Sequence, residues 1–442
     1  MAGETMLDTA KQAIKLAKEK GAAEVAAAAD LQREVSVTWR DGKLEKITEA
    51  TTRSLNLRLY VDGRYAAVST SDLRPEALGS FIENAIALTR TLSPDPHRSL
   101  PDPALYQGQA KGDLELADPR YGAVTAIERR QKAQALEAAA RAVKGSESII
   151  SVTTGFSDTS SEVYRVHSNG FEGSRRTTDF SVWAETTVKD ADGRRPEDWA
   201  DASARFYADL PDMALVGREA SERAMAGVGA KKMASAVMPV VIDNRMAGSM
   251  LKRLEQAMFG SMLQQKKSFL DGKLGQAVGS AKLTVDDDPL MPRGLASKLW
   301  DNEGIAAKRR PLFEGGVLKT YLVDTYYGKK LKAAPTTGET SNYAWKLGDR
   351  GQAALIADIK QGVLITRFLG GNSNATTGDF SLGIRGFAIR GGKIAEPVAE
   401  MNLSGNHLDL WKRLSAVGND PYPYAASRTP TLVFDGLQIA GT

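Results

Sequence analysis

The side chains best suited to bind a metal are few in this sequence and lie far apart. The chain has three histidines, His97, His167 and His407, and no cysteine. Catalytic zinc sites commonly take two histidines from adjacent turns of one helix. Three separated histidines could still converge in space, but their spacing favours surface or capping roles. The densest carboxylate group, Asp286–Asp288, lacks the alternating acceptors of a calcium loop and is interpreted as a turn at a strand end.

The sequence gives little more support for a catalytic nucleophile or for a phosphate-binding loop. The chain has no G-x-S-x-G nucleophile motif, and its single S-x-x-K match, Ser249–Lys252, is expected by chance. No G-x-x-x-x-G-K-[ST] string occurs either. From residue types and spacing alone, no active site can be assigned.

One polar segment stands apart, "GGNSNATTGDFSLG" at residues 370–383. Glycines, asparagines and hydroxyls lie there between two apolar runs, without a lysine and before a strand, so a phosphate role is disfavoured. Asn372, Asn374, Asp379 and Ser381 are instead predicted to bind an extended peptide or a partner. The alternative is an internally bonded Asx-type turn that only changes the chain direction.

Composition narrows the class of protein. With 442 residues, 42% hydrophobic and 25% charged, the chain is typical of a soluble globular protein of two or three domains. The net charge is only +4 and basic residues come in separated pairs, so nucleic-acid binding is not expected. No apolar run is long enough for a membrane helix, and the first residues lack a signal peptide's apolar core. We therefore expect no membrane association and a cytoplasmic location.

The pattern of elements that must position any site predicts an α+β fold. An amphipathic helix is followed by two hairpins, with turns at Asp41-Gly42 and Asp62-Gly63, and then by a helix from Pro75. A long alanine-rich helix and further strands complete an N-terminal helix and antiparallel-sheet domain, residues 1–230. After the small-residue connector "GVGAKKMAS" comes a β-rich C-terminal domain, residues 231–442, with short strands and glycine-rich turns.

The order of several longer strings resembles the TldD/PmbA family, whose members were first described as modulators of DNA gyrase and in which PmbA is also called TldE. The resemblance runs from about residue 55 to the C-terminus, and its strings are "LNLRLYVDGRYAAVSTSDLRPEAL", "SFLDGKLGQAV", "DDDPLMPRGLASKLWDNEGI", "GGVLKTYLVDTYYGKKL", "GGNSNATTGDFSLGIRGFAIRGGKIAEPV" and "NLSGNHLDLWKRLSAVGND".

One helix separates the two branches of that family. In the TldD branch the helix after "PVVIDN" carries H-E-x-x-x-H, two zinc-binding histidines with a glutamate positioned to activate water, and a late cysteine adds to the metal site. Here the helix reads "AGSMLKRLEQAMFGS", and in an approximate register Lys252, Arg253 and Ala257 replace the two histidines and the glutamate. Cationic side chains at two of these positions would repel a divalent cation. The chain therefore resembles the metal-free TldE/PmbA branch.

The resemblance implies a non-catalytic subunit of a heterodimeric TldD/TldE zinc metallopeptidase in the cytoplasm. Such a complex degrades unfolded proteins and peptides or matures peptide antibiotics, and the zinc and the peptide hydrolysis belong to the TldD-like partner. No cofactor is implied for this chain, no activity is expected from it alone, and a homodimer is allowed in isolation. The substrate would bind extended, by strand addition.

Three other functions stay open at this stage. The chain could be a self-sufficient hydrolase that uses Ser249 with Lys252 or a pair of carboxylates. It could be a nucleic-acid-associated regulator, against which the dispersed charge argues. It could also be a homodimeric binding or regulatory protein without a peptidase partner.

Overall fold

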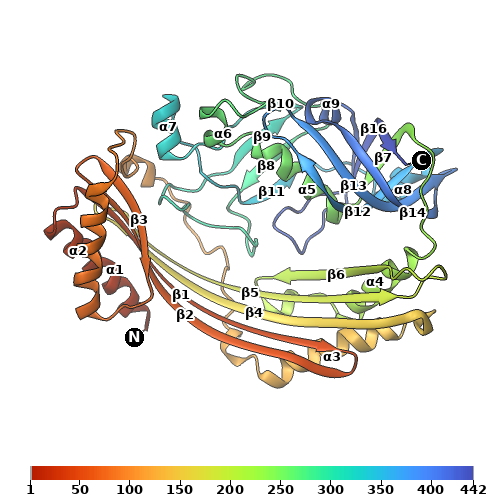
Figure 1. Cartoon of the computed structure of the whole chain (residues 1–442), viewed down its shortest axis with the longest axis horizontal. Coiled ribbons are helices and arrows are strands. Elements are labelled where there is room, and N and C mark those ends of the chain that lie inside the picture. The colour runs from red at the N-terminus through yellow and green to blue at the C-terminus, as the bar shows by residue number, and fades with distance from the viewer. Residues whose placement is uncertain (1, 442) are drawn as a thin grey trace.

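A large antiparallel sheet forms the frame of the N-terminal half in the computed structural model, which describes residues 2–441 (Figure 1). Every neighbouring pair of its strands is antiparallel. Asp41-Gly42 and Asp62-Gly63, all with positive φ, make the tight turns, as predicted. In spatial order the strands are β3 (Arg64–Thr70), β2 (Lys43–Val61), β1 (Glu24–Arg40), β4 (Ile149–His167), β5 (Glu172–Val188) and β6 (Glu197–Ala204).

Four helices cover one face of this sheet. They are α1 (Ala2–Glu19), α2 (Pro75–Thr91), α3 (Ala126–Arg141) and α4 (Met213–Ala226). Along β2 the alternate residues Leu55, Leu57 and Leu59 are buried against the first two helices, while Phe156 and Phe180 lie in the core under the other two. Successive strand residues point to opposite faces, so the intervening polar residues lie on the other face. Figure 1 shows the C-terminal half on that side.

The C-terminal half is built mainly from strands, as predicted. Its larger sheet has the order β14 (Lys393–Asn406), β13 (Asp379–Arg390), β12 (Gln361–Ser373), β7 (Ala236–Ile242), β16 (Leu432–Ala440) and β15 (Leu414–Val417). β14 also pairs with β16, so five of these strands close on themselves. β7 and β12 run parallel, whereas the other pairs are antiparallel.

A smaller sheet and short helices complete this half. The sheet comprises β10 (Val317–Leu318), β9 (Arg310–Glu314), β8 (Val285–Asp288) and β11 (Asn342–Trp345), so Asp286–Asp288 lie within a strand and not in a turn. The helices are α5 (Asn244–Gln256), α6 (Gly260–Gln264), α7 (Thr325–Leu331), α8 (Gln352–Ala357) and α9 (His407–Lys412). Single 3-10 turns lie at η1 (Pro103–Tyr106), η2 (Tyr121–Ala123), η3 (Ser146–Ser148) and η4 (Tyr207–Asp209).

The structure confirms the predicted fold class, a helix and antiparallel-sheet half followed by a β-rich half. The strands of the first sheet end at residue 204 and those of the closed sheet begin at residue 236. A domain boundary between residues 230 and 231 stays a prediction. Within residues 2–441, no helix has the length and apolar character needed to cross a membrane.

Candidate functional site

Helix α5 and the residue that follows it carry the three positions that the sequence singled out for their missing metal ligands. The carboxylate of Asp243 accepts a hydrogen bond from the backbone N–H of Arg245 and caps the start of the helix. Lys252 is exposed, Arg253 is half-buried, and Ala257 is buried just beyond the last helical residue. The sequence pattern predicts one helix over about residues 246–263, whereas α5 ends at Gln256 and a separate helix, α6, follows it.

The positive charge of Arg253 acts on a buried histidine, His407. Its Nη1 donates to the carbonyl oxygen of Ser249 at 2.9 Å, and its guanidinium carbon lies 5.9 Å from the ring centre of Phe368 on β12. Burial first, and then the positive charge of Arg253, lower the pKa of His407 to about 4. His407 is therefore a neutral imidazole at neutral pH.

The surroundings of His407 contradict the surface role expected for the histidines. Its ring is fully buried, stacks on Phe269 with ring centres 5.8 Å apart, and bonds through Nε2 to the hydroxyl of Ser373 at 2.9 Å. Its Nδ1 is buried without a hydrogen-bond partner among residues 2–441. His167 is buried as well. In the sequence each histidine lies next to a turn or the start of a helix. The residues around such a position do not indicate whether the side chain is buried.

These side chains do not fit a zinc ion. Lys252 and Arg253 carry positive charges that would repel the cation, and the methyl group of Ala257 offers no donor. Over residues 2–441, no group of three or more His, Asp or Glu side chains is placed to hold a metal. We therefore derive no metal-dependent step in this chain.

Glu255, on the same helix, is a buried acid that sequence reasoning missed. Its carboxylate accepts hydrogen bonds from the hydroxyl of Thr340 at 3.1 Å and from that of Tyr343. Burial raises its pKa to about 7, and Lys252 opposes the shift. Its burial could have been predicted from its position, because Glu255 lies four residues after Leu251 on the apolar face of the helix.

The raised pKa of Glu255 makes part of the stability depend on pH. The folded protein holds this proton more tightly than the unfolded chain, whose glutamate has a pKa near 4.5. Stability from this group therefore falls as pH rises from about 4.5 to about 7, by on the order of 3 kcal/mol. In Glu255→Gln, Tm relative to the wild type should rise across this window and then level off. A constant difference between the two Tm curves would contradict the burial of an ionisable group here.

The segment 370–383 is a β-hairpin and not an open loop. β12 continues to Ser373 and β13 begins at Asp379, so the turn itself is short. Asn374 accepts hydrogen bonds from the backbone N–H groups of Thr376 and Thr377, and the carboxylate of Asp379 accepts one from Asn406. Of the four predicted binding residues, Asn374 thus holds the hairpin's own turn, as the Asx-type alternative described, while Asp379 ties the hairpin to the end of β14.

The other two predicted residues form an exposed pair. Asn372 and Ser381 lie directly opposite each other on the two strands, and both are exposed. The hairpin also contacts the surroundings of α5, because Ser373 bonds His407 and the backbone N–H of Phe269 donates to the carbonyl oxygen of Ala375 at 2.9 Å. The structure therefore brings the hairpin and the Arg253 environment together, although about 120 residues separate them in sequence.

The Ser249–Lys252 motif has a structural explanation. The Ser249 hydroxyl donates its hydrogen to the carbonyl oxygen of Met246, one turn earlier in α5, at 2.8 Å. This bond is the usual local bond of a helical serine.

Comparison with known families decides where the chain belongs. Three domain models described as PmbA/TldA metallopeptidase match it in order, domain 1 at residues 32–89, the central domain at 119–228 and the C-terminal domain at 235–441. The chain belongs to the PmbA/TldD family. The sequence resemblance is thereby confirmed, and the chain is a metalloprotease-like protein of this family.

Relatives of the PmbA/TldD family cover nearly the whole chain. "Metalloprotease PmbA" of Escherichia coli O157:H7 is 27% identical over 92% of this chain and 90% of its own length, and the homologue from Haemophilus influenzae is 28% identical over 97% and 94%. A crystal structure of a "putative modulator of DNA gyrase" from Bacteroides thetaiotaomicron is 37% identical, with a TM-score of 0.95 over 98% of each chain. TldE from Thermococcus kodakarensis, at 19% identity, has a TM-score of 0.87 over 98% of this chain and 100% of its own, and shares the fold.

Proposed function

We propose that this chain is the non-catalytic, TldE-like subunit of a heterodimeric zinc metallopeptidase that acts on peptides or unfolded proteins in the cytoplasm. The observation that carries the proposal is the chemistry at the end of α5, where in an approximate register Lys252, Arg253 and Ala257 stand at the positions at which the TldD branch has H-E-x-x-x-H. Because this chain offers no zinc ligands at these positions, a zinc-dependent peptidase that contains it must hold the metal in another subunit. A TldD-like partner with H-E-x-x-x-H is the source that we infer.

The hairpin of β12 and β13 is the surface that we propose for substrate or partner contact. Asn372 and Ser381 present an amide and a hydroxyl side by side and are exposed. Such groups hydrogen-bond an extended backbone without reading its side chains, which suits a substrate class defined by being unfolded. Asn374 serves this role indirectly by fixing the turn, and Asp379 does so by tying the hairpin to Asn406 at the end of β14.

Purification from the native cells tests the proposed subunit role. The tagged chain should recover a near-stoichiometric protein that carries H-E-x-x-x-H, and mass spectrometry and zinc analysis should place the metal in the complex and not in this chain alone. Recovery of the chain alone, metal-free and still able to cut peptides, would overturn the proposal in favour of an independent hydrolase. Recovery alone and inactive would overturn it in favour of a binding protein.

Removing the exposed pair should weaken partner-dependent peptide hydrolysis. In Asn372→Ala combined with Ser381→Ala, loss of two hydrogen-bonding groups should lower kcat/KM of the complex about 10-fold. Gln131→Ala is the matched control, because it removes an exposed amide from α3 on the other side of the large sheet. Unchanged hydrolysis by the double variant, with unchanged Tm, would exclude the hairpin as a contact surface.

A further inference from the structure

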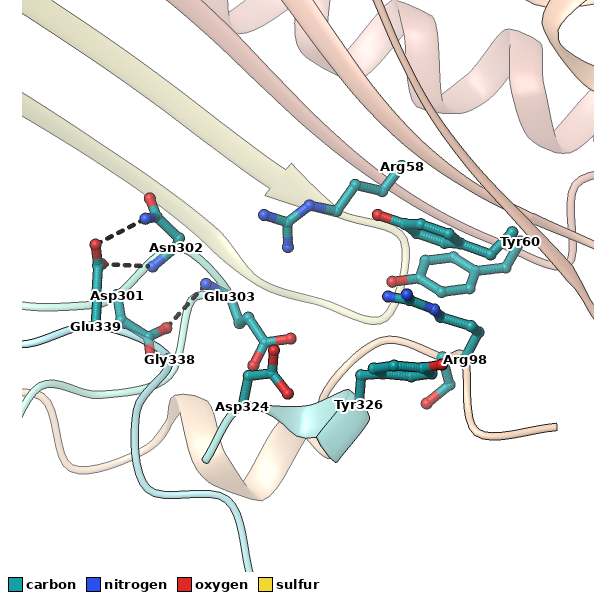
Figure 2. Close-up of a pocket in the computed structure, with 12 residues that line it drawn as sticks. Arg58, Tyr60, Arg98, Asp301, Asn302, Glu303, Asp324, Tyr326, Gly338 and Glu339 are labelled. Atoms are coloured by element: carbon teal, nitrogen blue, oxygen red, sulfur yellow. Dashed lines mark hydrogen bonds between the residues drawn. The ribbon is translucent and has the colours of Figure 1, made fainter. Parts of the chain in front are cut away.

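A polar cavity of about 250 Å³ lies between the two halves of the molecule (Figure 2). Strands β2 and β3 and the segment after α2 line one side with Arg58, Tyr60, Tyr65 and Arg98. The other side comes from residues 301–339, far along the chain. This cavity is separate from the α5 and hairpin site, and neither sequence reasoning nor the family comparison assigns it a role.

Arg58 brings an uncommitted positive charge to the cavity. Leu57 and Leu59 on either side of it pack under the helices, so Arg58 points to the opposite face of β2. The structure records neither a side-chain hydrogen bond nor an ion pair from Arg58 to any of residues 2–441. Figure 2 shows its guanidinium at the cavity with the Tyr60 ring beside it. An arginine in this state is suited to bind a carboxylate through two N–H groups.

Aromatic rings hold a second cation in place. The guanidinium carbon of Arg98 lies 4.4 Å from the ring centre of Tyr65 and 3.5 Å from that of Tyr326. Stacking between two rings fixes the plane of the guanidinium and leaves its N–H edges open. Tyr326 is fixed in turn, because its hydroxyl donates to the carboxylate of Asp95 at 2.8 Å.

On the other side of the cavity, two carboxylates each accept recorded hydrogen bonds, within residues 2–441, through only one of their two oxygens. Glu303 Oε2 accepts hydrogen bonds from the backbone N–H and the hydroxyl of Thr325, at 2.8 and 2.9 Å, and Asp324 Oδ1 accepts one from the N–H of Tyr327 at 2.7 Å. Within residues 2–441 their second oxygens accept no recorded hydrogen bond. Figure 2 shows these two carboxylates close together among the residues that line the cavity.

The remaining acids of the lining are already satisfied. Asp301 accepts from the backbone N–H groups of Glu303 and Ile305, and Glu339 pairs with Asn302 and, at 3.1 Å, with Lys298. Burial raises the pKa of Glu303, and the neighbouring charges of Asp301 and Asp324 add to the shift. A cation placed beside Glu303 and Asp324 would relieve this repulsion.

We propose that this cavity binds a small zwitterion, a free amino acid or a dipeptide, with its carboxylate at Arg58 and its ammonium group at Glu303 and Asp324. Opposite charges on the two sides favour a ligand that carries both, over a simple anion or a metal ion. The volume holds about eight waters at ~30 Å³ each, which limits the ligand to a small molecule. The proposal does not depend on the subunit role, because every group comes from this chain.

Calorimetric titration of the purified full-length chain tests the charge requirement. L-Alanine or L-alanyl-L-alanine should bind, and the comparison between them shows which length fits. N-acetyl-L-alanine, without the ammonium, and L-alaninamide, without the carboxylate, should each bind at least about 10-fold more weakly. Equal binding of either blocked compound would overturn the proposal, as would failure of both zwitterions to bind. Binding of Zn²⁺ or phosphate in place of the zwitterions would overturn it as well.

Two substitutions locate the ligand within the molecule. Arg58→Gln should weaken binding of the zwitterion at least about 10-fold, and so should Asp324→Asn, which keeps the oxygen that caps α7. Arg53→Gln is the matched control, because Arg53 is an exposed arginine of the same strand. Unchanged affinity in Arg58→Gln, with Tm equal to the wild type, would place the ligand elsewhere. If a variant fails to fold, the blocked compounds on the wild type still decide the proposal.

Discussion

Replacing Gly371 with alanine is expected to destabilise the β12–β13 hairpin by at least about 2 kcal/mol. Gly371 has φ of +114°, which a residue with a side chain rarely adopts. A Cβ there would also clash with the carbonyl oxygen of Ser381 and lie 2.8 Å from the Cα of Leu382, both in the backbone of the paired strand. The strands would have to separate where Asn372 and Ser381 lie opposite each other.

The neighbouring glycine supplies the control for this prediction. Gly370 has a similarly positive φ of +83°, but a Cβ there meets nothing within 4 Å. Gly370→Ala should therefore cost only the backbone strain, on the order of 1–2 kcal/mol. Calorimetry should give Gly371→Ala the lower Tm of the two, together with the greater loss of partner-dependent hydrolysis. Equal Tm values would contradict the close approach of the two strands at Gly371.

Breaking the buried ion pair between α3 and β4 is expected to destabilise the N-terminal half by about 3–5 kcal/mol. The guanidinium of Arg129 bonds both carboxylate oxygens of Asp158, at 2.5 and 3.0 Å, and donates to the carbonyl oxygen of Val124 at 2.7 Å. Only 5% of the Arg129 side chain and 0% of the Asp158 side chain are exposed. Asp158→Ala would leave the arginine charge buried without its partner.

A surface pair on the same sheet gives the comparison. Arg33 and Glu49 are linked across β1 and β2 at 2.8 Å, but their side chains are 37% and 58% exposed. Glu49→Ala should therefore cost less than about 1 kcal/mol. The double change Arg129→Met with Asp158→Leu should recover much of the lost stability, because it leaves no charge unpaired. A small effect of Asp158→Ala, similar to that of Glu49→Ala, would show that the pair is hydrated.

Local patterns were sufficient to predict the fold class. Alternating leucines at 55, 57 and 59 indicated a strand with one buried face, and Asp-Gly at 41–42 and 62–63 indicated the turns that the structure shows. The apolar face of α5 was also predictable from its spacing. The ends of that helix were not, because the same apolar spacing continues into α6 past a short break that the pattern does not mark.

The site was less predictable, because its contacts join segments that are distant in sequence. Composition left binding and an Asx-type turn as alternatives for the whole 370–383 segment, whereas the hairpin divides them, with Asn374 in the turn and Asn372 exposed on the strand. His407 stacks on Phe269 and its pKa is lowered by the charge of Arg253, and the zwitterion cavity joins Arg58 to Glu303. Periodicity does not predict such pairings, since they are set by tertiary packing, within the C-terminal half for His407 and between the two halves for Arg58 and Glu303.

Hydrolysis by the reconstituted complex tests the central claim most directly, that catalysis belongs to the partner. The TldD-like protein recovered with this chain would be prepared with the glutamate of its H-E-x-x-x-H motif changed to glutamine and combined with the unaltered chain. We predict that zinc binding and assembly persist while peptide hydrolysis is lost. Hydrolysis that continues with the altered partner would contradict the account and place a catalytic site in this chain.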